Sequence, residues 1–157
     1  MKLLPRPTIS SAWARLSGLP AGTRLFSRLI GRMAPYSGTV GAHVLELGDG
    51  YCRVELKDKK AVRNHLRSIH AIALMNLGEL ATGLAVMHEL DGKGRGIIRE
   101  LRMEYLKKAR GTITAEARAE LPHEPGSHDL IVTASLTDDA GDEVAKAYAT
   151  WRIDVTG

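Results

Sequence analysis

Residues 64–83, NHLRSIHAIALMNLGELATG, place one carboxylate, that of Glu79, inside a run of otherwise apolar residues. Between residues 69 and 87 the apolar side chains cover almost every direction around a helix, and helices that are apolar on all sides are buried ones. A buried carboxylate has to be paired, protonated or chemically active. Two histidines and an asparagine open the stretch, so several polar groups are expected where the chain enters the core. The sequence therefore predicts a buried helix with a candidate site at Glu79.

Composition narrows the class of protein. The chain has 157 residues, 44% hydrophobic and 25% charged, which fits one soluble globular domain. The single Cys52 cannot form an intrachain disulfide, so a cytoplasmic location is expected. We find no run of the roughly 18 apolar residues that a membrane span needs. A net charge of +4 would suit nucleic acid, but only 4% of residues are aromatic and no recognition motif is present. Anionic small molecules suit this positive charge at least as well as nucleic acid does.

The N-terminal part of the chain is basic. No acidic residue precedes Glu46, whereas six cations do: Lys2, Arg6, Arg15, Arg24, Arg28 and Arg32. A transit peptide has this composition, and a basic face could also bind a membrane surface. Against targeting, the apolar residues from Trp13 to Met33 are spaced for two amphipathic helical pieces that Pro35 ends. We therefore expect residues 1–35 to form a helical extension that packs on a domain of residues 36–157.

Beyond residue 38 the apolar residues alternate, which indicates strands. Residues 39–47 and 51–56 are expected to form a hairpin, and four more strands are expected after the helix, at residues 97–106, 112–121, 130–136 and 144–155. Their inner faces are rich in alanine, and Gly78 and Gly83 each cost about 1 kcal/mol against alanine within a helix. Both features indicate close contact between helix and strands. The sequence predicts an α+β fold with an antiparallel sheet wrapped around one long central helix.

This order of elements, the motif at residues 64–83 and the segment YLKKARGTITAEA at residues 105–117 resemble the hotdog-fold thioesterase superfamily. The similarity is to acyl-CoA thioesterases of the phenylacetate-degradation type, and in particular to a subfamily known as a domain of unknown function. The resemblance covers about residues 36–156 in architecture. It implies a hotdog fold and a homodimer whose sheets join edge to edge, with a tetramer left open. It also implies two active sites, at the dimer interface between the buried helices.

The resemblance further implies roles for four residues. In the family an asparagine precedes by six residues a histidine followed by glycine, and a catalytic carboxylate follows that histidine by nine; Asn64, His70 and Glu79 match. Glu79 would attack an acyl-CoA or related thioester, either by activating water or as a nucleophile that forms an anhydride. The backbone N–H of Ala71, from the other protomer, would stabilise the oxyanion. Asn64 and His70 would orient substrate or water.

One position departs from the family pattern. Ala71 stands where glycine usually follows the histidine, and its methyl group narrows the approach of a thioester to the backbone. Two functions therefore remain: hydrolysis of an acyl-CoA, or binding of an acyl group or acyl-CoA without catalysis. The acyl chain and its carrier, coenzyme A or acyl carrier protein, stay open. No cofactor is expected, and no metal, because no further ligand cluster accompanies His65, His70 and Glu79.

Each candidate residue also has a structural explanation. Glu79 could form an ion pair or a hydrogen bond to a strand, His70 could start the helix, and Asn64 could stabilise a loop. Asn76, one turn before Glu79, could hydrogen-bond its carboxylate or line a substrate pocket.

The remaining polar candidates are the cations before the helix. Arg63 and Arg67 either are solvated or hold the phosphates of coenzyme A. Tyr105 and Trp151 are expected to be packing residues in the core or at an interface.

Overall fold

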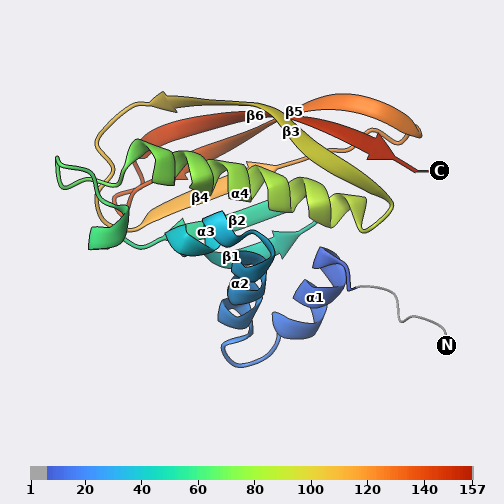
Figure 1. Cartoon of the computed structure of the whole chain (residues 1–157), viewed down its shortest axis with the longest axis horizontal. Helices are drawn as coiled ribbons and strands as arrows, with labels where there is room; N and C mark the ends of the chain where they lie inside the picture. Colours follow the sequence, from blue (N-terminus) through green and yellow to red (C-terminus); the bar gives the residue numbers. More distant parts are fainter. Residues whose placement is uncertain (1–6, 157) are drawn as a thin grey trace.

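The computed structural model describes residues 7–156, with the elements in the predicted order (Figure 1). The helices are α1 (Ile9–Leu16), α2 (Gly22–Met33), α3 (Pro35–Val40), the short 3₁₀ helix η1 (Lys60–Val62) and α4 (Ala71–Leu90). The strands are β1 (His43–Gly48), β2 (Tyr51–Leu56), β3 (Gly94–Tyr105), β4 (Ile113–Arg118), β5 (Gly126–Thr137) and β6 (Glu143–Val155). Lys2 and Arg6, which belong to the predicted N-terminal extension, lie outside the described residues.

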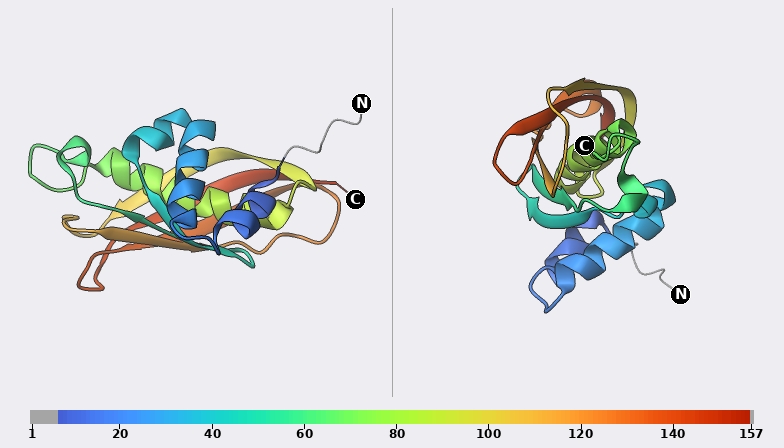
Figure 2. Two further views of the ribbon diagram at one scale, coloured as in Figure 1. Left: turned by 90° about the horizontal axis from the view of Figure 1, so that it is seen from below. Right: turned by 90° about the vertical axis from the view of Figure 1, so that its left-hand side faces the viewer.

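The six strands form one antiparallel sheet in the order β1-β2-β4-β5-β6-β3. Helix α4 contacts all six strands, and an end-on view shows the sheet curving around it (Figure 2). The edges of the sheet are β1 and β3. The predicted hotdog fold, an antiparallel sheet wrapped around one long helix, is confirmed.

Small residues allow the close contact between α4 and the sheet. A Cβ atom at Gly78 would lie 2.6 Å from the Cβ of Ala147 on β6, and one at Gly83 would lie 3.1 Å from the ring of Trp151. Ala145, Ala147 and Ala149 are fully buried on the inner face of β6. A larger side chain at either glycine would therefore push the helix away from the strand, as the sequence pattern indicated.

Helix α4 has the composition of a membrane span but the place of a core helix. Within residues 7–156 it alone is long and apolar enough to cross a membrane, judged by length and composition. However, 61% of that apolar window is buried inside the fold. Its apolar surface is therefore accounted for by packing against the sheet.

Helices α1 and α2 lie below the hairpin in Figure 1, whereas α3 lies higher, between α2 and α4, and contacts both. Phe26 and Ile30 of α2 are buried in the core, and Trp13 of α1 packs edge-on against Phe26, with ring centroids 5.0 Å apart. Residues 39 and 40, predicted as strand, instead end α3, because Pro35 starts a new helix after it ends the previous one. The predicted domain boundary between residues 35 and 36 falls after the first residue of α3, and it stays a prediction.

Candidate active site

Glu79 lies on the one side of α4 that its own sheet leaves open. Ile72, Met75 and Glu79, spaced by three and four residues, form a partly exposed row, which we call the open stripe; Ile72 is 49% exposed. Most other residues of the helix are buried. The sequence predicted a buried carboxylate, whereas the single chain leaves Glu79 partly exposed, because the sheet does not close over this side.

The carboxylate of Glu79 stands alone among the described residues. No side chain within residues 7–156 forms an ion pair or a hydrogen bond with it, so neither structural explanation for this residue is observed. Asn76 does not reach it either, because its Nδ2 atom donates to Ser37 Oγ of α3 at 3.0 Å. Burial raises the pKa of Glu79, since desolvation disfavours the charged form. A carboxylate in this state suits general-base chemistry near neutral pH.

Trp151 and Thr82 fix the backbone of α4 at Glu79. The Trp151 indole Nε1 donates to Thr82 Oγ1 at 3.2 Å, and the Thr82 hydroxyl donates to the backbone carbonyl of Glu79 at 3.0 Å. A Cβ atom at Gly83 would also lie 3.7 Å from Glu79 Oε1, so the indole and the carboxylate flank the same glycine. The sequence indicated only packing for Trp151; its link to Glu79 spans some seventy residues and leaves no local signal.

The start of α4 offers a free backbone donor. His70 caps the helix, with its Nδ1 accepting from the N–H of Ile72 at 3.0 Å. The carbonyl of Ala71 accepts from the hydroxyl of Tyr105 at 2.9 Å, a contact that sequence analysis missed. The N–H of Ala71 has no hydrogen-bond partner in the described part of the chain. It lies at the positive end of the helix dipole, where a developing negative charge is stabilised.

Asn64 holds the loop before the helix. Its Oδ1 atom accepts from the N–H of Leu66 at 2.9 Å, from the N–H of Ser68 at 3.2 Å and from the Ser68 hydroxyl at 3.1 Å. Arg67, inside this turn, adopts a left-handed backbone with φ of 56°. The loop-stabilising explanation of Asn64 is therefore observed, and a role in orienting substrate stays a prediction.

The two arginines predicted to hold phosphates differ in their contacts. Arg63 Nε donates to Asp58 Oδ1 at 2.6 Å, and this bond holds the pKa of Asp58 below its usual range. Arg67 is exposed and forms no ion pair with any described residue. A phosphate-binding role for either stays a prediction. In residues 7–156 no three histidine, cysteine, aspartate or glutamate side chains gather as metal ligands would.

Glu79 and the N–H of Ala71 are too far apart to act together within one chain. They are eight residues apart on one helix, which corresponds to a rise of about 12 Å. Attack on a carbonyl and stabilisation of its oxyanion require both groups within about 3 Å of the reacting atoms. One chain thus carries both kinds of group, but it does not bring them together.

Comparison with known proteins identifies the family of the chain. Residues 22–153 match the family described as "Domain of unknown function (DUF4442)". The crystal structure of genomics APC5556 is 30% identical, with a TM-score of 0.80, and the match covers 94% of this chain and 99% of that one. A Pseudomonas aeruginosa protein of unknown function, described as a probable thioesterase, is 26% identical, with a TM-score of 0.75 and coverage of 87% and 97%.

A thioesterase family protein from Silicibacter pomeroyi shares the fold at 19% identity, with a TM-score of 0.69 and coverage of 82% of this chain and 96% of that one. No curated protein matches. The family match covers most of the chain, including α2, α3, the sheet and α4. The chain therefore belongs to the DUF4442 family, within the hotdog-fold thioesterase superfamily.

Proposed function

We propose that the protein hydrolyses acyl thioesters of coenzyme A, at sites that two protomers build together. The observation that carries this proposal is the carboxylate of Glu79, which is desolvated and has no partner in the described chain. It follows His70 by the spacing that the family uses for its catalytic carboxylate. The names of the similar structures, which include a probable thioesterase, support the same reaction class.

The chemistry divides between the middle of α4, at Glu79, and its start, at Ala71. By one route Glu79 takes a proton from water as the water oxygen adds to the thioester carbonyl. By the other route the carboxylate itself adds, the thiolate leaves, and water then hydrolyses the resulting anhydride. In both routes the carbonyl oxygen becomes negatively charged, and the N–H of Ala71 would donate to it. By the first route the thiolate leaves and takes the proton that Glu79 accepted; by the second, the water that hydrolyses the anhydride supplies the proton. Both routes regenerate the free carboxylate.

The distance between Glu79 and Ala71 supports a homodimer, because a second copy can supply the missing group. The strand β3 supports it too: it is a twelve-residue sheet edge, and its Ile97 is 66% exposed. Long uncovered edges tend to pair with another strand. Pairing of β3 with its copy would extend the sheet and bring the two open stripes toward one another. A tetramer of paired dimers stays open.

We also propose a cytoplasmic location. Cys52 is fully buried, and burial raises the pKa of its thiol to about 12, so it has the properties of a core residue rather than of a reactive thiol. A single cysteine without a disulfide is typical of reducing compartments.

A thiol-release assay tests the proposal. Short, medium, branched and aryl acyl-CoAs would be offered to the parent protein and to Glu79→Gln. We expect turnover of at least one substrate by the parent and its loss in the variant. The methyl group of Ala71, beside the free N–H, favours the second candidate function, acyl-CoA binding without catalysis. Tight binding with no thiol released by the parent would support that function and exclude hydrolysis.

A further inference from the structure

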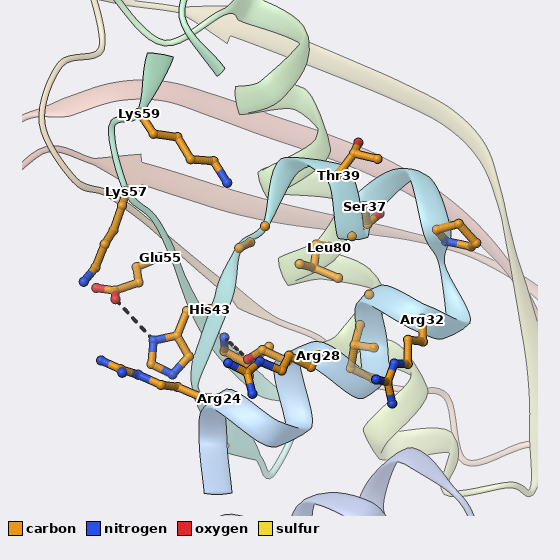
Figure 3. A pocket seen from close by; sticks show the side chains of 18 residues that line it. Arg24, Arg28, Arg32, Ser37, Thr39, His43, Glu55, Lys57, Lys59 and Leu80 are labelled. Atoms are coloured by element: carbon orange, nitrogen blue, oxygen red, sulfur yellow. Dashed lines mark hydrogen bonds and ion pairs between the residues drawn. The ribbon is translucent and has the colours of Figure 1, made fainter. Parts of the chain in front are cut away.

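A pocket of about 870 Å³ opens between α2, α3 and the hairpin of β1 and β2 (Figure 3). Its lining includes Leu80 but not the preceding residue, Glu79, so it faces a different side of α4 from the open stripe. Buried apolar side chains line its inner part: Ile30, Val44 and Leu80. The pocket is therefore separate from the candidate active site.

Five cations line this pocket, and they come from two walls. Arg24, Arg28 and Arg32 follow one another along α2, and Lys57 and Lys59 lie across from them, after β2 (Figure 3). We call these five the cationic pocket residues. The single carboxylate in the lining is that of Glu55, and it is held by His43 at 3.3 Å. Positive charge in the pocket is thus almost unopposed.

Like several other exposed cations, Arg67 among them, the cationic pocket residues have no acidic partner in the described part of the chain. None of them forms an ion pair or a side-chain hydrogen bond with any residue between 7 and 156. Elsewhere, six arginines pair with carboxylates: Arg53, Arg63, Arg95, Arg99, Arg102 and Arg152. The five cations around this concave surface are thus among those that the described part of the fold leaves unpaired.

This arrangement is unfavourable for the protein by itself. Arg24, Arg28 and Arg32 recur at four-residue spacing, and like charges at that spacing repel and destabilise a helix. Lys59 lies at the pocket wall, with its Nζ 2.7 Å from where a Cβ atom of Gly41 would be. Gly41 has φ of 74°, so glycine there permits both the turn and the approach of the ammonium group. A bound anion would remove this repulsion.

The spacing of the charges indicates the ligand. Arg24 and Arg32 are eight residues apart, a rise of about 12 Å, and the lysines lie on the opposite wall. One phosphate cannot contact all of them. No phenylalanine, tyrosine or tryptophan side chain is part of the lining, so the stacking that single-stranded nucleic acid requires is missing. We propose that the pocket binds a small molecule that carries phosphate groups at two or more separated positions, with an uncharged part over the apolar floor.

Coenzyme A has phosphates at two separated positions. Inorganic pyrophosphate carries phosphate charge without the separated positions or the uncharged part, so both are suitable probes. Binding would be measured by calorimetry at roughly 50 and 200 mM salt, where phosphate contacts weaken steeply. Three double variants each remove two positive charges: Arg24→Gln with Arg28→Gln, Lys57→Gln with Lys59→Gln, and, as a control outside the pocket lining, Lys93→Gln with Arg118→Gln. All six side chains are exposed, so the variants should fold.

We expect coenzyme A to bind the parent and both pocket variants to weaken it by about tenfold or more. The control and Glu79→Gln should bind as the parent does. Equal weakening in all three double variants would overturn the proposal, because it would show only a general charge effect. Binding that no pocket variant weakens would place coenzyme A elsewhere. Binding to vesicles with anionic lipid, but to neither soluble probe, would assign the cations to a membrane surface instead.

Discussion

Glu79 and Leu80 are neighbours in the chain, but they face two regions with opposite properties. The open stripe around Glu79 is apolar, with one uncompensated carboxylate and no cation in contact. The pocket beside Leu80 has five cations and one carboxylate that is already paired. The pocket has both of its walls within one chain, whereas Glu79 lies about 12 Å along the helix from the donor it needs. Under the proposed mechanism, one region requires a second protomer and the other does not.

Removal of the Glu79 carboxylate should have the largest effect, and only on the open stripe. In Glu79→Gln the amide can neither accept a proton nor attack, so turnover of an acyl-CoA should fall by about a thousandfold. Thiol release measures the loss. Glu89→Gln, an exposed glutamate on the same helix, is the matched control and should keep full activity. Unchanged turnover in Glu79→Gln would remove this residue from the mechanism.

Removal of the Ala71 donor should have the next largest effect. Proline is well tolerated at the first position of a helix, and His70 already has the extended backbone, φ −63° and ψ 140°, that a residue before proline prefers. Ala71→Pro therefore deletes the N–H with little cost to folding, and turnover should fall by about a hundredfold.

Ala71→Gly serves as the control for this position, because it keeps the N–H and removes the methyl group. It should retain or increase turnover, and thermal unfolding would verify that all three proteins are folded. Full activity in Ala71→Pro would show that the donor lies elsewhere.

Asn64 should affect stability more than chemistry. Asn64→Ala removes an oxygen that accepts three hydrogen bonds in the loop before α4, so the free energy of unfolding should fall by about 1–3 kcal/mol. Asn64→Asp keeps the acceptor and should restore most of that stability. Chemical denaturation measures both. If Asn64→Ala were as stable as the parent but inactive, the residue would orient substrate rather than hold the loop.

The smallest expected effect is on stability as a function of pH. Burial raises the pKa of Glu79 above its ordinary value of 4.5, so the folded state binds this proton more tightly than the unfolded state. Its contribution to stability is therefore present below pH 4.5 and is lost as the pH rises through the raised pKa. Glu79→Gln should melt higher than the parent at pH 7, by roughly 2–4 °C, with the gain shrinking near pH 4. A constant difference would contradict the raised pKa.

The sequence was sufficient for the fold because the decisive signals are local. The all-round apolar pattern of residues 69–87 predicts a buried helix, and the glycines and inner alanines predict close strands. Both are observed at Gly78 and Ala147. The error at residues 39 and 40 also has a local cause. The alternation of apolar residues in the hairpin extends back to these positions, but Pro35 at the first helical position starts a helix that includes them.

The sites were only partly predictable, because their contacts are distant in the chain. Glu79 stands out as the one carboxylate in an apolar run, so a single sequence reveals it. Tyr105 reaches Ala71 across 34 positions, and the pocket joins Arg24 to Lys59 through the packing of α2 against the hairpin. No spacing rule connects such residues. The arginines that the sequence favoured, Arg63 and Arg67, lie outside that pocket.

A mixed dimer tests most directly whether the active site is shared between protomers. Glu79→Gln and Ala71→Pro, each inactive alone, would be co-expressed with different tags and the mixed dimers purified on both. If Glu79 of one chain acts with Ala71 of the other, one of the two sites is intact, and mixed dimers should have about half of the parental turnover. If each site lay within one chain, both would be defective. Inactive mixed dimers, or none formed at all, would contradict the shared site.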